Sequence, residues 1–331
     1  MKRLPFLLLL IIFGLGFSQG VLALTVSPPV IELGGNPGQE VKSIIRLFNE
    51  TDQTVNVWTS TADFGAKKGE EGEPVFYEPT EKENDLSKWI KIVPGPISIP
   101  PLSWQSIPFS VKIPNNADPG GHYAAIFFGN RPPEKSKAVG IVSKVGSLVL
   151  LRVTGDIHEE GKLLTFSLKD KKKFFEFLPV TFEIRFQNSG NVHLKPQGEI
   201  VITDMVGKVE GRVPVNKVRS GGNVLPNSIR KYEASWVKKE YREIPSTFWG
   251  KVLAEKNNFA FGKYRANLTL EYGLNPKKAY GVLYFWVFPW HLILVSAIGF
   301  ILLILLLYFG IKRYNRWIIK KALGERNYPK K

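Results

Sequence analysis

Few residues of this chain have the types and spacing that metal or nucleophilic chemistry requires. The sequence contains no cysteine, which excludes disulfides and thiolate catalysis. Its histidines never fall in the HxxxH or HExxH spacing that sets two ligands on one face of a helix, so we expect no metal site. They are His122, His158, His193 and His291.

Three segments have residue types that suit ligand binding. His122 follows two glycines at the expected start of a strand, where it either contacts a ligand at a loop tip or lies half-exposed in the strand. The acidic stretch 70–85 contains the carboxylates that calcium prefers, but it lacks the order of a tight calcium loop; a solvated loop is the alternative. Lysines cluster in 169–173 before two phenylalanines. They either meet anionic polymers or lipid headgroups, or form a turn before a strand.

The sequence carries no signature of an enzyme. Neither the G-x-S-x-G pattern of a hydrolase nor a P-loop occurs in it. Catalysis would therefore need polar side chains that the fold brings together from distant strands. We expect that the protein is not an enzyme and has no catalytic residues and no cofactor.

A long apolar segment near the C-terminus determines the expected topology. Residues 289–311 include the run His291–Ile311, which contains no Asp, Glu, Lys or Arg. As a helix this run spans roughly 30 Å, the thickness of the hydrocarbon core of a bilayer. The tail 312–331 carries eight basic residues and one acidic residue, so the positive-inside rule places it in the cytoplasm.

The N-terminus has the pattern of a secretory signal peptide. A short basic start precedes an apolar run from Leu4 to Phe17, and a cleavage site follows at Ala23. An uncleaved anchor is the alternative, although this run is short for a membrane span. The signal peptide 1–23 and the C-terminal helix together predict a single-pass type I protein of the cell membrane, with residues 24–288 outside the cytoplasm.

The net charge of +16 mostly reflects this topology. The signal peptide holds two positive charges and the tail a net seven, which leaves the ectodomain at +7. The basic residues of the ectodomain do not cluster on one motif, so we expect no nucleic acid among the partners. Exported eukaryotic domains of this kind often contain disulfides, so a cysteine-free ectodomain favours a bacterial surface.

The pattern of the ectodomain is that of an all-β protein. Short alternating or apolar runs are separated by Pro, Gly, Asn and Asp, and no convincing amphipathic helix lies between 24 and 285. At about 100–150 residues per domain, its length fits two domains. We therefore predict two tandem immunoglobulin-like β-sandwiches, 24–156 and 157–288, followed by one transmembrane α-helix.

Some individual segments carry more specific expectations. Leu24–Leu33 should be an edge strand, because Pro28 and Pro29 interrupt its ladder. Residues 63–88 should form a polar excursion with a short strand at Val75–Tyr77, and Phe248–Glu255 should be a strand of the second domain. The segments Ile45–Asn49 and Ile184–Asn188 both end a strand at an Asn-containing turn, which indicates an internal repeat.

The N-terminal third has an arrangement of motifs that resembles a known family. In order, these motifs are Ser27-Pro28-Pro29, the turn Pro37-Gly38, a strand ending in Asn49-Glu50-Thr51, a long polar excursion, a strand ending in Ile113-Pro114, and Asp118-Pro119-Gly120-Gly121-His122-Tyr123. The arrangement resembles the WxL-interacting-protein family of bacterial surface proteins, once described only as a domain of unknown function. The resemblance implies an N-terminal sandwich associated with peptidoglycan binding, a second sandwich, a transmembrane helix and a basic tail, and so covers nearly the whole chain.

One of these motifs also resembles a second family. Pro119-Gly120 and Tyr123 are similar to the Pro-Gly-x-Tyr turn of pilus-type periplasmic chaperones, which have a similar first domain but no membrane anchor. Two hypotheses about function follow. In the first, the protein is a cell-surface scaffold that tethers cell-wall polymer, such as peptidoglycan, or a surface partner protein to the membrane. In the second, it is a membrane-anchored, chaperone-like assembly factor for exported surface subunits.

The second hypothesis makes a structural prediction of its own. A chaperone-like factor should present a long unpaired edge strand, flanked by basic residues, in a groove between the two domains. A fully covered edge would count against it.

Overall fold

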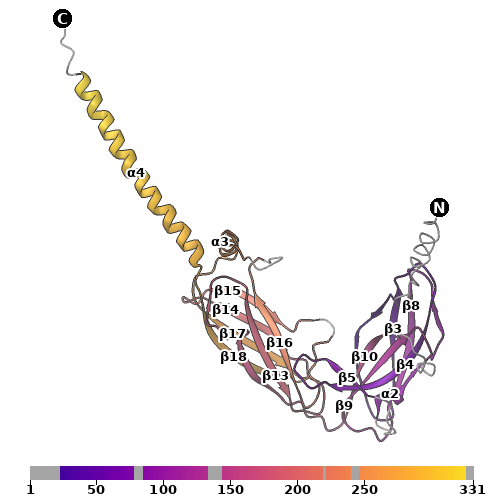
Figure 1. Ribbon diagram of the computed structural model, residues 1–331. Helices are drawn as coiled ribbons and strands as arrows, with labels where there is room; N and C mark the ends of the chain where they lie inside the picture. Colours follow the sequence, from indigo (N-terminus) through magenta and orange to yellow (C-terminus); the bar gives the residue numbers. More distant parts are fainter. Residues whose placement is uncertain (1–22, 78–84, 133–143, 219–220, 240–245, 326–331) are drawn as a thin grey trace, which may run out of the picture. The chain divides into compact units, whose positions relative to one another are not determined.

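The computed structural model describes residues 23–77, 85–132, 144–218, 221–239 and 246–325 (Figure 1). The protein is mostly β, with sheets that form sandwiches and one apolar C-terminal helix, as predicted. Most of the predicted signal peptide and part of the acidic stretch lie outside the described residues. By contacts the chain divides into two compact units. Unit 1 comprises Met1–Gly161, Asn188–Leu194 and Val218–Ile229; unit 2 comprises Lys162–Gln187, Lys195–Lys217 and Arg230–Lys331.

The sandwich in unit 1 has one sheet in the order β1-β3-β8-β6 and another in the order β2-β10-β9-β4-β5, with β7 paired to β4. Alternate residues of these strands, such as Ile45, Leu47 and Phe128, are fully buried between the sheets. The elements are β1 (Leu24–Ser27), β2 (Val30–Gly35), β3 (Glu40–Asn49), β4 (Val55–Ala66), β5 (Pro74–Phe76), α2 (Leu86–Trp89), β6 (Ile90–Ile92), β7 (Ile97–Ile99), β8 (Trp104–Lys112), β9 (Gly120–Gly129) and β10 (Lys144–Val153).

The opening segment Leu24–Leu33 lies at a sheet edge as predicted, but it is not one strand. Pro28 and Pro29 separate β1 from β2, and the two pieces join opposite sheets. β1 pairs antiparallel with β3, whereas β2 pairs parallel with β10. The two prolines, which have no N–H group to donate, therefore lie where the chain crosses between sheets and no ladder needs that donor.

The second sandwich has a sheet in the order β11-β13-β16 and a sheet in the order β12-β18-β17-β14-β15. Its core is aromatic: the rings of Phe182 and Tyr264 both contact Phe285, at 5.8 and 5.7 Å between centroids. The elements are β11 (Gly161–Leu168), β12 (Phe174–Phe175), β13 (Val180–Asn188), β14 (Gln197–Thr203), β15 (Val209–Val215), β16 (Ser228–Trp236), α3 (Phe248–Asn257), β17 (Gly262–Tyr272), β18 (Lys277–Val287) and α4 (Trp290–Glu325).

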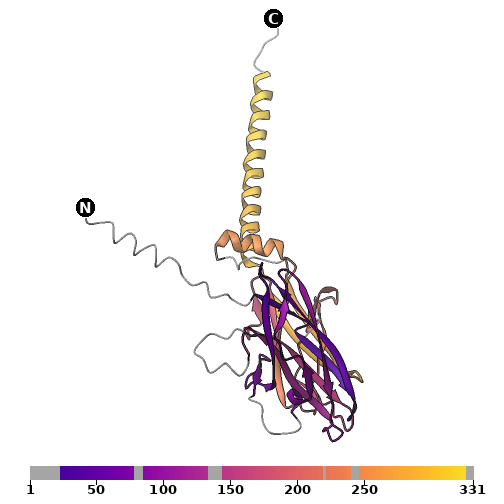
Figure 2. The same cartoon turned by 90° about the vertical axis from the view of Figure 1, so that its right-hand side faces the viewer.

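The predicted strand at Phe248–Glu255 is wrong, as is the expectation that no helix would lie in the ectodomain. This segment is the helix α3, and it crosses the base of α4 (Figure 2). The hydroxyl of Thr247 caps α3 by accepting a hydrogen bond from the Gly250 amide at 3.1 Å. The hydrophobic residues of this run repeat four apart, which is a helical spacing, but so short an apolar run is also compatible with a strand.

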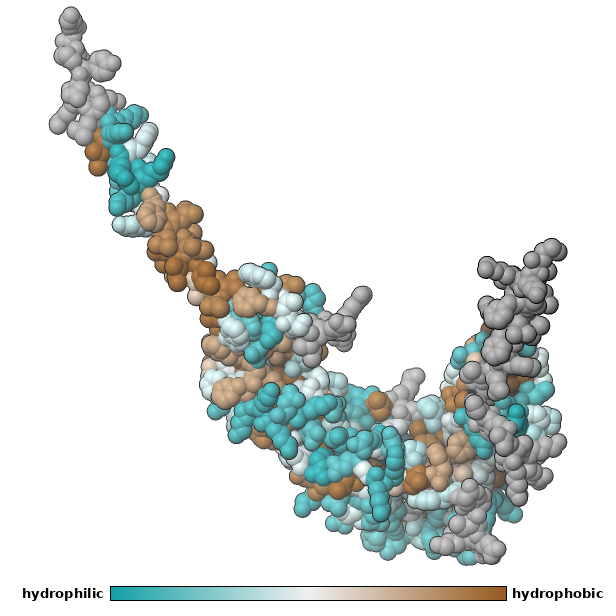
Figure 3. Space-filling view, in the orientation of Figure 1, coloured by the Kyte–Doolittle hydropathy of each residue, from teal (hydrophilic) through white to brown (hydrophobic). Residues whose placement is uncertain are grey.

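The C-terminal helix α4 is longer than the predicted span 289–311. An 18-residue stretch of it is strongly apolar and unburied by the rest of the protein, so the helix is long and apolar enough to cross a membrane. Its apolar and basic parts follow one another along the axis (Figure 3). The helix continues without a break through the first part of the basic tail, to Glu325.

Two buried asparagines support the internal repeat. Asn49 ends β3 and Asn188 ends β13, and neither has any exposed surface. In each, the side-chain NH2 donates to the carbonyl four residues later and to a distant backbone carbonyl, while the side-chain oxygen accepts from the amide two residues later. Each asparagine therefore closes its own hairpin in the same way.

Candidate binding edge on β18

The candidate residues in unit 1 have internal partners. The ring of His122 contacts Trp89 at 4.7 Å, and its Nε2 lies 2.9 Å from the carbonyl oxygen of Asp118. His158 is exposed and lies 3.2 Å from a carboxylate oxygen of Asp156. Among the residues that the structure describes, no group of three His, Asp or Glu side chains is placed to hold a metal ion.

A polar cluster in unit 1 surrounds His193. Arg152 and Glu159 form an ion pair at 2.6 Å, and both side chains are largely buried. The hydroxyl of Tyr123 lies 3.4 Å from Nδ1 of His193, and burial lowers the pKa of this histidine to about 4. Burial also raises the pKa of Tyr123. Because these groups satisfy one another, the cluster is better suited to stability than to binding.

The turn with the Pro-Gly-x-Tyr pattern belongs to the same part of unit 1. Gly120 has a φ of +124°, and a Cβ there would lie only 2.7 Å from the carbonyl oxygen of Asn191. The amide of Gly121 donates to that same oxygen at 2.8 Å. The glycines are therefore needed for close backbone approach, and the turn has a structural role here.

An open strand edge lies on β18. β12 covers only Trp286 and Val287 of this strand. The amides of Trp286 and Phe288 donate to carbonyls of Lys173 and Phe175, so their backbone groups point to that side of β18. Since a strand has a period of two, the backbone groups of Tyr284, Val282 and Tyr280 point to the same side, where no described strand pairs with them.

An aromatic stripe follows this edge on the outer face of the sheet. Its side chains are exposed, although the residues on the solvated face of a sheet are usually polar. The ring of Phe174 stacks on Trp286 at 6.3 Å, and the ammonium group of Lys263 lies 4.9 Å from the centre of the Tyr284 ring. The stripe consists of Tyr280, Val282, Tyr284, Trp286 and Phe288.

A groove of about 620 Å³ lies beside the same edge. Its walls combine apolar side chains from β11 and β18 with the ammonium groups of Lys171, Lys173 and Lys263. Part of the predicted lysine cluster therefore does reach a surface groove, whereas Lys169 forms an ion pair with Glu233 at 2.7 Å. The lining is Phe166, Ser167, Leu168, Lys171, Lys173, Phe174, Lys263, Leu283, Tyr284 and Trp286.

This arrangement is suited to binding an extended polypeptide. The free backbone groups of β18 can pair with an added strand, and the stripe and groove can take its alternate side chains. The lysines favour acidic side chains or a terminal carboxylate in that strand. In unit 1, β2 covers β10 from Leu148 to Val153.

Sequence reasoning found the lysines of the groove but missed the edge itself. The signal was present: from Tyr280 to Phe288 every second residue is apolar, and the residues between them include Leu283, Phe285 and Val287. The sequence predicts a strand at Gly281–Phe288, but a strand that is apolar on both faces does not by itself reveal an exposed face or an open edge. Only the pairing of the strands shows that one of these faces is solvent-exposed.

Comparisons with known proteins give structural likeness only. No protein-family model and no curated protein matches the chain. Among solved structures, the class 5 fimbriae chaperone CfaA is 12% identical, with 78% of this chain and 98% of that chain covered and a TM-score of 0.36. The CupB2 chaperone of Pseudomonas aeruginosa is 10% identical, with 80% and 100% covered and a TM-score of 0.33. The E. coli chaperone DraB is 12% identical, with 79% and 98% covered and a TM-score of 0.33.

CfaA is described as a fimbriae chaperone and the other two as chaperones. At these TM-scores the likeness does not assign a ligand or a function. The resemblance to the WxL-interacting-protein family stays a prediction, since no comparison bears on it.

Proposed function

We propose that this protein is a membrane-anchored binding protein outside the bacterial cytoplasm, which holds segments of exported polypeptides in a chaperone-like manner. The observation that carries the proposal is the open edge of β18, with its aromatic stripe and lysine-lined groove. The role is one of binding and needs no catalysis. Anchoring is supported by α4, whose apolar part is long enough to cross a bilayer.

Strand addition is the binding mode that these features favour. Main-chain hydrogen bonds supply affinity for any extended segment. Pockets for alternate side chains make the site prefer some sequences over others. The exposed aromatic rings are of the type that dominates the energetics of protein interfaces. The preferred segment should therefore alternate apolar and acidic residues.

A peptide array that tiles the exported proteins of the source organism tests this proposal. The full chain, held in lipid nanodiscs, is applied to the array with and without a Val282→Pro substitution. We expect segments of alternating apolar and acidic character to bind, and to bind at least about tenfold more weakly to the variant, a difference of about 1.4 kcal/mol. Equal binding to both proteins would overturn the assignment of the edge.

Tethering of cell-wall polymer is the competing hypothesis, and it has its own arm in the experiment. The same nanodiscs are sedimented with purified insoluble peptidoglycan. Retention on peptidoglycan together with a silent peptide array would replace the proposed function by a wall-binding one.

A further inference from the structure

The first turn of α4 is held by a residue of α3. Glu255 is fully buried, and its Oε2 accepts a hydrogen bond from the amide of Leu292 at 2.6 Å. Its Oε1 lies 2.6 Å from Nδ1 of His291. Because the first amides of a helix lack intrahelical partners, Glu255 acts as a cap supplied by another helix. This contact fixes α3 at the level where the apolar run of α4 begins.

The exposed face of α3 is apolar. Trp249 and Leu253 lie four residues apart on this face and are 69% and 56% exposed, while Ala254 and Glu255 on the other face are buried. Lys256 follows on the exposed face and can reach headgroups while its stem stays on the apolar surface. A helix with an exposed aromatic face and a basic end is typical of a membrane interface.

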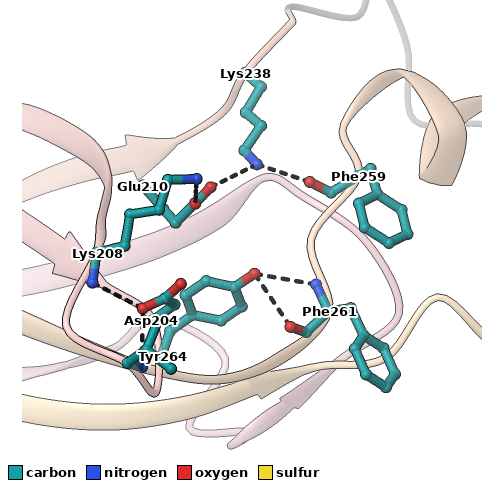
Figure 4. A network of polar contacts seen from close by, with 8 residues as sticks. Asp204, Lys208, Glu210, Lys238, Phe259, Phe261 and Tyr264 are labelled. Atoms are coloured by element: carbon teal, nitrogen blue, oxygen red, sulfur yellow. Dashed lines mark hydrogen bonds and ion pairs between the residues drawn. The ribbon is translucent and has the colours of Figure 1, made fainter.

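Two phenylalanines after α3 extend this apolar surface. Phe259 and Phe261 are about half exposed, and their rings point away from a network of polar contacts that holds their backbone (Figure 4). The ammonium group of Lys238 donates to the carbonyl of Phe259 at 2.7 Å, and the hydroxyl of Tyr264 accepts from the amide of Phe261 at 3.0 Å. The exposed rings are therefore on an ordered backbone.

The same network includes the turn between β14 and β15, whose tip is also apolar. Val206 is 86% exposed, and its amide donates to the carboxylate of Asp204 at 3.0 Å, which shapes the turn. Met205 is exposed as well, and a Cβ at Gly262 would lie 3.3 Å from its Cε. This turn thus lies next to the Phe261 loop.

We propose that α3, the Phe259–Phe261 loop and the Met205–Val206 turn lie in the interface of the membrane that α4 enters. These three segments form a lipid-contacting surface on unit 2. The buried carboxylate of Glu255 ties α3 to the first turn of α4, so a bilayer that takes up Leu292 onward lies at the level of α3. Aromatic and aliphatic side chains at this depth replace contacts with water by contacts with acyl chains. The inference rests on the proposed membrane anchoring and adds a second, shallow attachment to it.

Single-cysteine labelling tests this inference directly, because the natural chain has no cysteine to interfere. The full chain is reconstituted in nanodiscs and labelled with an environment-sensitive fluorophore at Leu253→Cys, Val206→Cys or Ile301→Cys. Asn275→Cys, exposed in the turn between β17 and β18 at the end of β18 away from α4, is the control. Lipids that carry a nitroxide near the headgroup or deep in the acyl chain serve as quenchers.

We expect the labels at Leu253 and Val206 to be quenched most by the shallow nitroxide, the label at Ile301 by the deep one, and the label at Asn275 by neither. Quenching at Ile301 without quenching at Leu253 and Val206 would overturn the inference and leave the anchoring intact. No quenching at Ile301 would overturn the anchoring itself, and with it the inference.

Discussion

Glu255 and His291 form a buried contact of 2.6 Å between α3 and the start of α4. The same carboxylate accepts the amide of Leu292, so one side chain holds both helices together. Removing it leaves a buried amide and a buried imidazole without their partner. The link between the second sandwich and the apolar helix thus depends on a residue 36 positions away from His291 in sequence.

Glu255→Ala should weaken this link by about 1–3 kcal/mol, the cost of leaving buried polar groups unsatisfied. Hydrogen exchange of the amides in α3 and in the first turn of α4 measures the effect, and we expect faster exchange in both. Glu255→Gln keeps one acceptor oxygen and should lose less. Unchanged exchange in Glu255→Ala would show that the contact does not hold the two helices.

Val282→Pro should abolish strand addition at β18 without unfolding the sandwich. The amide of Val282 points to the open edge rather than to β17, so proline removes a donor for the partner and none from the ladder. Binding of an array-selected peptide, followed by fluorescence anisotropy, should fall at least about tenfold. Val282→Thr keeps the amide and should bind within a factor of about three. An equal loss of peptide binding in both variants would show that the side chain of Val282, and not its amide, is responsible.

Charge reversal at the groove should weaken binding of acidic segments. Exposed ion pairs contribute about 0.2–1 kcal/mol each, so Lys171→Glu with Lys173→Glu should reduce affinity by about two- to thirtyfold. The loss should shrink as salt is added, because screening already weakens the attraction in the natural protein. Lys162→Glu, an exposed position on β11 outside the groove lining, is the control for charge. Equal losses in the groove and control variants would indicate non-specific attraction.

The two hairpin asparagines should be equally sensitive to truncation. Asn49→Ala and Asn188→Ala each leave buried backbone groups without a partner, at a cost of about 2–4 kcal/mol. Urea unfolding measures this loss, with Asn116→Ala, on the surface, expected to stay within about 0.5 kcal/mol of the natural protein. A small effect at either buried site would contradict the equivalence of the two hairpins.

His193 should make the stability of unit 1 sensitive to acid. Its pKa is about 4 in the folded protein, below the value of about 6.5 for an unfolded histidine. The unfolded chain therefore binds more protons in this window, and stability falls as pH drops from about 6.5 to about 4, by at most about 3 kcal/mol. The charged groups that face it are Glu32, Arg152 and Glu159.

His193→Gln removes this titration but not those of its neighbours. Urea unfolding at pH 7.5 and pH 5 should show a smaller loss of stability in the variant than in the natural protein. The same pH dependence in both proteins would assign the effect to the carboxylates.

The all-β class and the C-terminal helix followed from period and composition, because alternation, turn residues and an uncharged apolar run are local signals. α3 did not follow. Its apolar residues are spaced for a helix, but Phe248–Asn257 is short. Several of its apolar side chains also face outward, so its sequence does not show one apolar and one polar face. Its N-cap, Thr247, is a local signal for the start of a helix.

The binding edge could be predicted only in part. Lys171, Lys173 and Phe174 were recognised from their clustering, which is visible in sequence. The open edge of β18 depends on how far β12 extends along it, and β12 pairs with only Trp286 and Val287. That is a property of non-local pairing, which residue types along the chain do not specify.

Hydrogen exchange at β18 tests the central claim most directly. The full chain in nanodiscs is saturated with an array-selected peptide, and exchange is resolved to single amides. The account predicts new protection at Tyr280, Val282 and Tyr284, whose amides face the open edge, and little change at Gly281 and Leu283, which already face β17. Tight peptide binding with no new protection at these three amides would contradict strand addition at β18.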